Sequence, residues 1–259
     1  MHRILVDDVM SNSGLEPPFQ ILYEKRACLC VVKPGGLLTQ APPHIDSLDS
    51  QIKQFVKTRD KKSGRVYLGV PHRLDRPVTG AMVFCRNVRA ARRLSEQFRQ
   101  RTVTKTYWAF VAGHPEPDAG TWTDTIRKIP DVAQAEISSV DDPLSREVIL
   151  HYQVLAKTGQ GSLLEIQLET GRYHQIRIQC SSRGLPILGD SQYGSEVPFG
   201  PTTENIRERH IALHSRYLKF RHPMIDETVE VTADLTEHWN DIDSWNPDWE
   251  SNSMKVENP

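Results

Sequence analysis

HRLDRPVTG, residues 72–80, places one carboxylate, Asp75, between Arg73 and Arg76. The stretch ends in a glycine, and the apolar run of residues 81–85 follows it directly. Opposite charge nearby favours the anionic form of an acid, so Asp75 is expected to be ionised at neutral pH. An ionised carboxylate held in a loop can act as a nucleophile or as an electrostatic base. A weak surface ion pair would give the same local pattern, so the rest of the chain has to decide between the two.

The charge of the chain is divided unevenly along its length. The whole sequence of 259 residues has a net charge of −1, from 33 acidic and 32 basic residues. Residues 226–259 hold ten of those acids and one base, so residues 1–225 hold 23 acids and 31 bases, a net charge of +8. A basic body suits a polyanionic partner, and an acidic tail would moderate non-specific binding.

Composition and cysteine usage narrow the class of protein. Hydrophobic residues make up 38% and charged residues 25%, as in soluble globular proteins. No apolar run approaches the roughly 20 residues that a transmembrane helix needs, and residues 1–14 contain no apolar signal segment. The cysteines form no CxxC pair and no zinc-ligand spacing with a histidine; they are Cys28, Cys30, Cys85 and Cys180. We therefore expect reduced, mostly buried thiols, no metal ion and a cytoplasmic protein.

Short strands and helices are mixed along the chain without a βαβ rhythm. Alternating or continuous apolar patterns predict strands near residues 21–23, 28–32, 105–111, 148–154, 164–168, 210–220 and 228–232. This order favours an α+β fold with a mixed, largely antiparallel sheet and flanking helices. The chain is long enough for one large domain or two small ones.

Two helices are predicted from caps and periodicity. Asn87 can cap a helix that ends near Arg101, and its buried stripe would consist of Val88, Ala91, Leu94 and Phe98. A second helix would begin at Thr170 and end at Gly184, with Pro186 preventing its continuation.

The second predicted helix carries the other dense cluster of polar residues, GRYHQIR at residues 171–177. On a helix, His174 and Arg177 share one face. Arg177 stands between two isoleucines, where a guanidinium is buried at tolerable cost only beside a partner. Asp75 is the candidate carboxylate.

Together these motifs resemble the RluA family of pseudouridine synthases. The similarity is carried by residues 72–76 with Thr79 and Gly80, and by residues 171–177. Further matches follow in the order of the family: residues 31–38, then Phe98, Lys105, Tyr107 and Gly113, then residues 184–190, 193–194, 213–215 and 220–223. Roughly residues 17–235 are covered, and six motifs in one order make coincidence very improbable.

The resemblance implies an isomerase that converts uridine to pseudouridine within an RNA chain, without a cofactor. Carried over by position, Asp75 matches the catalytic aspartate, Tyr107 the tyrosine that packs against the target base, and Arg177 the arginine that pairs with the aspartate. The implied fold is a pseudouridine synthase sheet with a central catalytic cleft. Asp75 could abstract the ribose 2′ proton or attack C1′ or C6, and the sequence leaves these routes open.

Further residues are candidates for contact with the RNA. Around the extruded nucleotide we expect His72, Arg73, Arg76, His174 and Ile176. The first three could equally brace the catalytic loop, and His174 could instead orient Arg177 or that loop by hydrogen bonds. The RNA backbone would meet the cations of the first helix and its exit, namely Arg89, Arg92, Arg93, Arg99 and Lys105, which face the single acid Glu96. A solvated helix face is the alternative for this charge run.

The resemblance also sets expectations for domains and substrate. We expect an N-terminal leader at residues 1–16, a catalytic domain at 17–238 and an acidic tail at 239–259. Many members carry an N-terminal S4 module, for which no room is expected here, so a stem-loop of tRNA or ribosomal RNA is favoured as substrate. A monomer is the default expectation for an enzyme that binds a large partner. Val78-Thr79-Gly80 replaces the common Thr-Ser-Gly and loses one hydroxyl.

Two other classes of function remain in view. A non-catalytic RNA-binding protein on the same fold would not need Asp75, Tyr107 and Arg177 together. A nucleoside or glycoside hydrolase would ordinarily need two carboxylates, and Glu169 is the sole further acid near either motif.

Overall fold

The computed structural model describes the backbone of residues 15–252 and the side chains as far as residue 249. These residues form two compact units, each made of two separate stretches of chain. Unit 1 consists of residues 15–104 and 215–234, and unit 2 of residues 105–214 and 235–252. The predicted leader, residues 1–16, lies almost wholly outside the described residues. The predicted boundaries at residues 17 and 238 remain predictions.

Unit 1 is built on antiparallel strand pairs. Its strands are β1 (Ile21–Lys25), β2 (Cys28–Lys33), β3 (Thr79–Cys85), most of β9 (Leu213–Arg221) and β10 (Thr228–Thr232). β2 pairs with β1 on one side and β3 on the other, and β10 pairs with β9. The strands predicted at residues 21–23, 28–32 and 228–232 are confirmed, and the apolar run at 81–85 forms most of β3.

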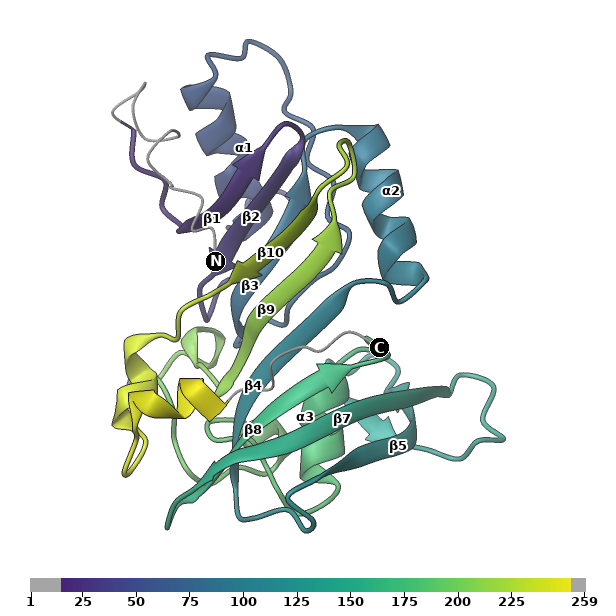
Figure 1. Ribbon diagram of the computed structural model, residues 1–259, viewed down its shortest axis with the longest axis vertical. Coiled ribbons are helices and arrows are strands. Elements are labelled where there is room, and N and C mark those ends of the chain that lie inside the picture. Colours follow the sequence, from purple (N-terminus) through teal and green to yellow (C-terminus); the bar gives the residue numbers. More distant parts are fainter. Residues whose placement is uncertain (1–14, 253–259) are drawn as a thin grey trace. The chain divides into compact units, whose positions relative to one another are not determined.

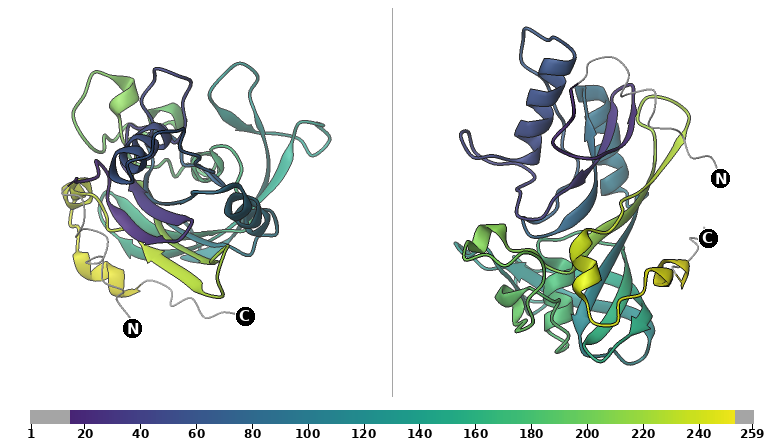
Figure 2. Two further views of the ribbon diagram at one scale, coloured as in Figure 1. Left: turned by 90° about the horizontal axis from the view of Figure 1, so that it is seen from above. Right: turned by 90° about the vertical axis from the view of Figure 1, so that its left-hand side faces the viewer.

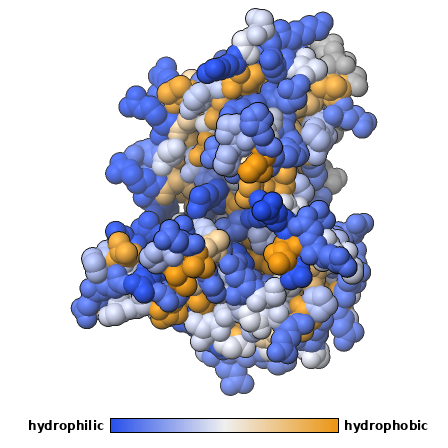
Figure 3. Space-filling view, turned by 180° about the vertical axis from the view of Figure 1, so that it is seen from behind, coloured by the Kyte–Doolittle hydropathy of each residue, from blue (hydrophilic) through white to orange (hydrophobic). Residues whose placement is uncertain are grey.

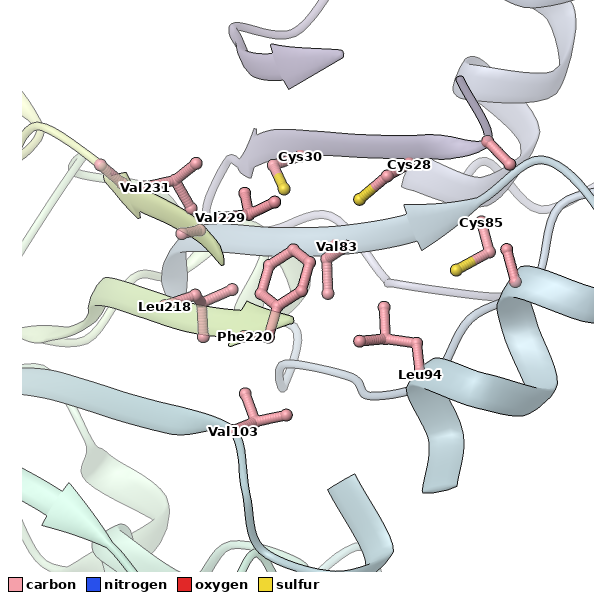
Figure 4. Close-up of a cluster of buried hydrophobic side chains, with 14 residues drawn as sticks. Cys28, Cys30, Val83, Cys85, Leu94, Val103, Leu218, Phe220, Val229 and Val231 are labelled. Carbon is pink, nitrogen blue, oxygen red and sulfur yellow. The ribbon is translucent and has the colours of Figure 1, made fainter. Parts of the chain in front are cut away.

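The core of unit 1 follows the two-residue period of its strands. Cys28 and Cys30 alternate on β2, and Val83 and Cys85 on β3 oppose them, because successive strand residues point to opposite faces. Leu218, Phe220, Val229 and Val231 of β9 and β10 complete the cluster with Leu94 of a helix, as Figure 4 shows. All four cysteines of the chain are buried and free, as expected from the sequence.

Two helices pack at separate places against the strands of unit 1 (Figures 1 and 2). Helix α1 (Leu48–Arg59) is capped by Ser47, and α2 (Val88–Arg99) is capped by Asn87, whose side chain accepts from the Ala90 amide. The predicted cap of α2 is therefore confirmed.

The predicted buried stripe of α2 is wrong at its first residue. Val88 is 56% exposed, whereas Ala90 and Leu94 are fully buried. Residues four apart lie on one face, so burying Ala90 and Leu94 turns Val88 away from the core. Phe98, four residues further on, is partly buried against the same cluster.

Unit 2 contains a second antiparallel sheet. In spatial order its strands are β4 (Thr104–Ala112), β8 (Gly161–Leu168), β7 (Arg146–Lys157), β5 (Ala119–Lys128) and β6 (Ala135–Ile137). The three strands predicted in this region are confirmed, whereas β5 and β6 were not expected. The chain thus has the predicted α+β class, with a largely antiparallel sheet and few helices.

Helix α3 (Gln175–Ser181) lies against β5 and β6 and is shorter than predicted (Figure 1). The expected start at Thr170 is wrong by five residues, because His174 adopts the left-handed conformation with φ of 53° and ends the loop before the helix. The expected end at Gly184 is three residues too late, because the helix ends at Ser181 and a turn follows it. Gly184 lies in that turn with φ of 71°, and the Leu185 amide bonds back to the Cys180 carbonyl.

Short 3-10 helices occur in the second half of the chain. They are η2 (Ser191–Tyr193), η3 (Ile206–Glu208), η4 (Glu237–Asp241) and η5 (Pro247–Asn252). The first part of the predicted acidic tail is therefore structured: Trp239 is buried, and the rings of Trp239 and Trp245 lie 5.7 Å apart. The rest of the tail, after residue 252, lies outside the described residues.

Hydrophilic side chains predominate on the face seen in Figure 3, and hydrophobic ones form separate small groups. None of the helices in residues 15–252 has the length and apolar character required to cross a membrane.

The first testable prediction concerns Gly80, the second residue of the buried strand β3. Its φ is 114°, and a Cβ there would lie 2.4 Å from the Ser215 carbonyl oxygen. Gly80→Ala should therefore lower the free energy of unfolding by about 3 kcal/mol, from backbone strain and overpacking together. Gly64→Ala is the matched control, because a Cβ at Gly64 meets nothing within 4 Å. Equal urea midpoints for the two variants would contradict this reading.

Candidate active site

The Asp75 loop, residues 72–80, leads into β3 and presents its carboxylate at a half-buried position. Leu74 before it and Val78 after it are buried. The Val78 amide donates to the Asp75 carbonyl at 3.1 Å and closes a tight turn around the acid. The backbone of Asp75 is thus folded by its apolar neighbours, and its side chain is left partly accessible.

A buried lysine fastens the loop on one side of Asp75. The Lys33 ammonium donates to the carbonyls of Pro34 at 2.7 Å, Leu37 at 2.6 Å and Arg76 at 3.0 Å. Lys33 is completely buried at the end of β2. One charged group therefore joins the turn after β2 to the residue that follows Asp75.

A threonine fastens the loop on the other side. The Thr39 hydroxyl donates to the Leu74 carbonyl at 2.9 Å, and the Leu74 amide donates back to the same hydroxyl at 3.2 Å. The two neighbours of Asp75 in sequence, Leu74 and Arg76, are both held by side chains from the segment 33–39. Such bracketing restricts the directions in which the carboxylate can point.

His72 supports the start of the loop. Its Nε2 accepts a hydrogen bond from the Val83 amide at 3.0 Å, and its ring stacks on Phe98 with centroids 4.7 Å apart. Arg73 is exposed and Arg76 is half-buried. Of the predicted substrate contacts in unit 1, His72 thus has a bracing role in the structure. Contact of Arg73 and Arg76 with a nucleotide remains a prediction.

The electrostatic environment of Lys33 is unusual for a lysine. Burial lowers the pKa of Lys33 to about 7, against the opposing attraction of the Asp75 carboxylate and with a further contribution from Arg76. Lys33 and Asp75 therefore interact electrostatically within unit 1, and the protonation of Lys33 changes near neutral pH.

Arg177 is the centre of a second buried constellation, in unit 2. Its Nε and Nη2 donate to the two carboxylate oxygens of Asp190 at 2.6 and 2.7 Å, a bidentate ion pair. Nη2 also donates to Gln192 at 2.8 Å. Arg177 and Asp190 are 4% and 2% exposed, so the pair lies out of water. Asp190 is thus a carboxylate partner of Arg177 within unit 2.

His174 links Arg177 to Tyr193. Arg177 Nη1 lies 3.0 Å from His174 Nε2, and His174 Nδ1 lies 2.8 Å from the Tyr193 hydroxyl. Because a guanidinium can only donate, Nε2 must accept, and the hydrogen of the neutral ring resides on Nδ1. His174 therefore orients Arg177, which is one of the two supporting roles expected for it. Ile176 is buried, and its contact with the nucleotide remains a prediction.

Tyr107 lies on β4, opposite Ile166 of β8. It is 7% exposed, and its neighbour Trp108 donates from its indole nitrogen to buried Glu165 at 3.1 Å. The sheet therefore fixes the position of Tyr107. A fixed aromatic ring is what the expected packing against the target base requires. Asp75 belongs to unit 1, Tyr107 and Arg177 to unit 2. The pairing of Asp75 with Arg177 remains a prediction.

The predicted basic residues of α2 differ in their partners and in their exposure. Arg93 donates to the Pro223 carbonyl at 2.9 Å, and Arg99 is paired with Glu96. Arg89 and Arg92 are exposed, and neither forms an ion pair with another residue in the described part of the chain. Lys105 lies half-buried at the start of β4. RNA-backbone contact by this face remains a prediction.

Comparison with known proteins decides the family. The model of the RNA pseudouridylate synthase family matches residues 27–182, a segment that includes Lys33, the Asp75 loop, Tyr107 and Arg177. The chain belongs to the RNA pseudouridylate synthase family. Members of this family are isomerases that act on RNA, so the activity expected from the motifs is confirmed.

Relatives of the synthase cover most of its length. It is 31% identical to tRNA pseudouridine synthase C of Pasteurella multocida over 248 residues, which span 91% of this chain and 98% of the relative. It is 32% identical to the dual-specificity RNA pseudouridine synthase RluA of Haemophilus influenzae, over 86% of this chain and 95% of the relative. The solved structure of human RNA pseudouridylate synthase domain containing 4 matches with a TM-score of 0.67 and 26% identity, covering 84% of this chain and 89% of the human one.

A second prediction concerns the buried ion pair. Asp190→Asn should lower the free energy of unfolding of the synthase by about 3 kcal/mol, because it leaves the buried Arg177 charge uncompensated. Glu96→Gln removes the acid of an exposed pair on α2 and should have a far smaller effect, because water screens that pair. Urea unfolding of both variants measures the contrast. Similar losses would show that burial of the Arg177 pair has no energetic weight.

A third prediction concerns the pH dependence of stability. Between the pKa of Lys33 in the folded state, about 7, and the ordinary value of 10.5, the unfolded chain binds more protons than the folded chain. Wild type should therefore gain about 2 kcal/mol of unfolding free energy relative to Lys33→Met between pH 7 and pH 9. Urea titrations at several pH values measure this difference. A difference that does not change with pH would contradict a lowered pKa.

Proposed function

We propose that the synthase converts uridine to pseudouridine in a stem-loop of tRNA or ribosomal RNA, with Asp75 as its catalytic carboxylate. The observation that carries the proposal is the bracketed carboxylate. Lys33 and Thr39 bind the residues on both sides of Asp75, whose side chain is half-buried. The choice of RNA is supported by the two bacterial relatives, whose names specify tRNA and dual specificity and which match this chain almost from end to end.

The reaction is an isomerisation that needs no external reactant. The N1–C1′ bond of the nucleotide breaks, the uracil turns, a C5–C1′ bond forms, and the proton on C5 is lost as N1 gains one. An ionised carboxylate can begin this sequence as a base toward the 2′ proton or as a nucleophile toward C1′ or C6. Each route starts from the same group, and Asp75 is the one carboxylate in residues 72–80.

Arg177 and Tyr107 have the remaining roles. Hydrogen bonds to Asp190, Gln192 and His174 fix the orientation of the Arg177 guanidinium. We assign Arg177 the role of pairing with the Asp75 carboxylate, and a guanidinium oriented in advance loses little freedom in doing so. Tyr107 would offer its ring to the target base and its hydroxyl to the C5 proton.

The setting of the reaction completes the proposal. We place the synthase in the cytoplasm as a monomer that binds RNA and uses no cofactor. Four buried, unpaired thiols support a reducing compartment. Extrusion of a uridine costs least in loops and weakly paired sites, which supports a stem-loop target.

The fourth prediction tests the role of Asp75. Asp75→Asn should retain the wild-type thermal unfolding midpoint and RNA affinity while losing pseudouridine formation by at least about 10³-fold, because the amide is neither a base nor a nucleophile. Asp226→Asn, which changes an exposed acid, is the matched control and should keep full activity. Carbodiimide mapping of tRNA and both ribosomal RNAs measures the product at each site.

The same experiment discriminates the alternatives. Pseudouridine formation by folded Asp75→Asn at the wild-type rate would reject the proposed role of Asp75. Release of free uracil would point to a glycosidic hydrolase, because isomerisation leaves the mass of the RNA unchanged. Modification of an RNA other than tRNA or ribosomal RNA would reject the proposed substrate class.

A further inference from the structure

An open groove of about 470 Å³ runs beside α2 in unit 1. Its apolar lining comes from Tyr67, Val88 and Ala91, and its charged lining from Arg92, Glu96 and Arg99. Asp75 is not part of this lining. The groove therefore calls for a ligand that has both a flat apolar part and a negative charge.

The groove is formed by a close approach between the segment before β3 and α2. Gly69 forms a two-way backbone bridge with Cys85 of β3, at 2.7 and 2.9 Å. A Cβ on Gly69 would lie 2.5 Å from Ala91 Cβ, so the absence of a side chain lets the segment lie directly against the helix. Tyr67, two residues earlier, is thereby placed along α2.

The apolar surfaces of the groove are accessible. Tyr67 is 45% exposed and Val88 is 56% exposed, so both large apolar side chains can be reached by a ligand. An accessible tyrosine ring beside a basic helix is a stacking platform, because every nucleobase has a π face that can lie on it.

The charge around the groove is positive. Arg92 and Arg99 line it against the single acid Glu96, and exposed Arg89 precedes Arg92 on the same helix. Glu96 already pairs with Arg99 at 2.6 Å. Arg92 is thus the lining cation best placed to meet an anion such as a phosphate.

We propose that this groove binds one nucleotide of a single-stranded segment of the substrate RNA, with its base on Tyr67 and its phosphate at Arg92. This inference rests on the proposed function, since it concerns how the same RNA is held. A purely acidic ligand would leave the Tyr67 and Val88 surfaces unused, and a purely apolar one would bury Arg92 without a partner. A nucleotide satisfies both.

The groove is tested with two 12-nucleotide RNA probes, oligouridylate and an abasic ribose-phosphate oligomer of equal length. All variants carry Asp75→Asn, so that binding is measured without turnover. Tyr67→Ala should weaken oligouridylate binding about 10-fold and leave abasic binding unchanged, while Tyr67→Phe should bind both as Tyr67 does. These proteins must share one thermal unfolding midpoint, which excludes misfolding as the cause.

Arg92→Ala should weaken both probes and reduce the slope of log affinity against log salt by about 0.7, the value for one phosphate contact on a single strand. Lys57→Ala, which removes an exposed cation of α1, is the matched control and should leave both affinities and the slope unchanged. Photo-crosslinking of a 4-thiouridine oligomer should label the peptide that contains Tyr67.

Several outcomes would overturn the proposal. Equal oligouridylate affinity for Tyr67→Ala and Tyr67 would remove the stacking platform, as would crosslinks that avoid residues 65–69 and α2. Equal loss of both probes in Tyr67→Ala would show a general disturbance of the surface. Pseudouridine formation by the protein with intact Asp75 is measured separately, so a failed groove and a failed proposed function give different results.

Discussion

The active-site loop of the synthase depends on one buried ammonium group. Lys33 donates to three backbone carbonyls, one of which belongs to Arg76, the residue after Asp75. A buried cation is costly unless it has hydrogen-bond acceptors. Here the acceptors belong to the turn after β2 and to the Asp75 loop, so Lys33 connects these two segments. Together with Thr39 at Leu74, this arrangement builds the position of the carboxylate into the fold before any RNA binds.

Unit 2 also contains a buried cation held by hydrogen bonds. In unit 1 the buried cation positions the reactive residue, whereas in unit 2 the buried cation is itself the residue that is positioned. There a guanidinium is buried, and Asp190, Gln192 and His174 hold it through four hydrogen bonds. Asp75 and Arg177 are thus each oriented by residues of their own unit. Burial makes both arrangements rigid, because a buried charge that lost its partners would be costly.

The sequence predicted the parts of this account that depend on local pattern. The cap residue Asn87 predicted α2, the alternation of apolar and polar residues predicted β7 and β8, and the motif around Asp75 predicted the reaction. Helix α1 also has a readable signal in Ser47 and the apolar residues that follow, although it was not predicted. The partner of Arg177 could not be read in this way. Asp190 lies 13 residues further along the chain, and its place directly after the stretch LPILG, residues 185–189, was its sole sequence signal.

The central claim is that the backbone around Asp75 is held in its catalytic position by Lys33. Single-turnover pseudouridine formation by Lys33→Met at saturating RNA tests it most directly, because RNA binding and product release then do not limit the rate. The account predicts a rate about 10²-fold below that of wild type, the effect of a small misplacement of the reacting group, with RNA affinity unchanged. A folded Lys33→Met protein that reacts at the wild-type rate would contradict it.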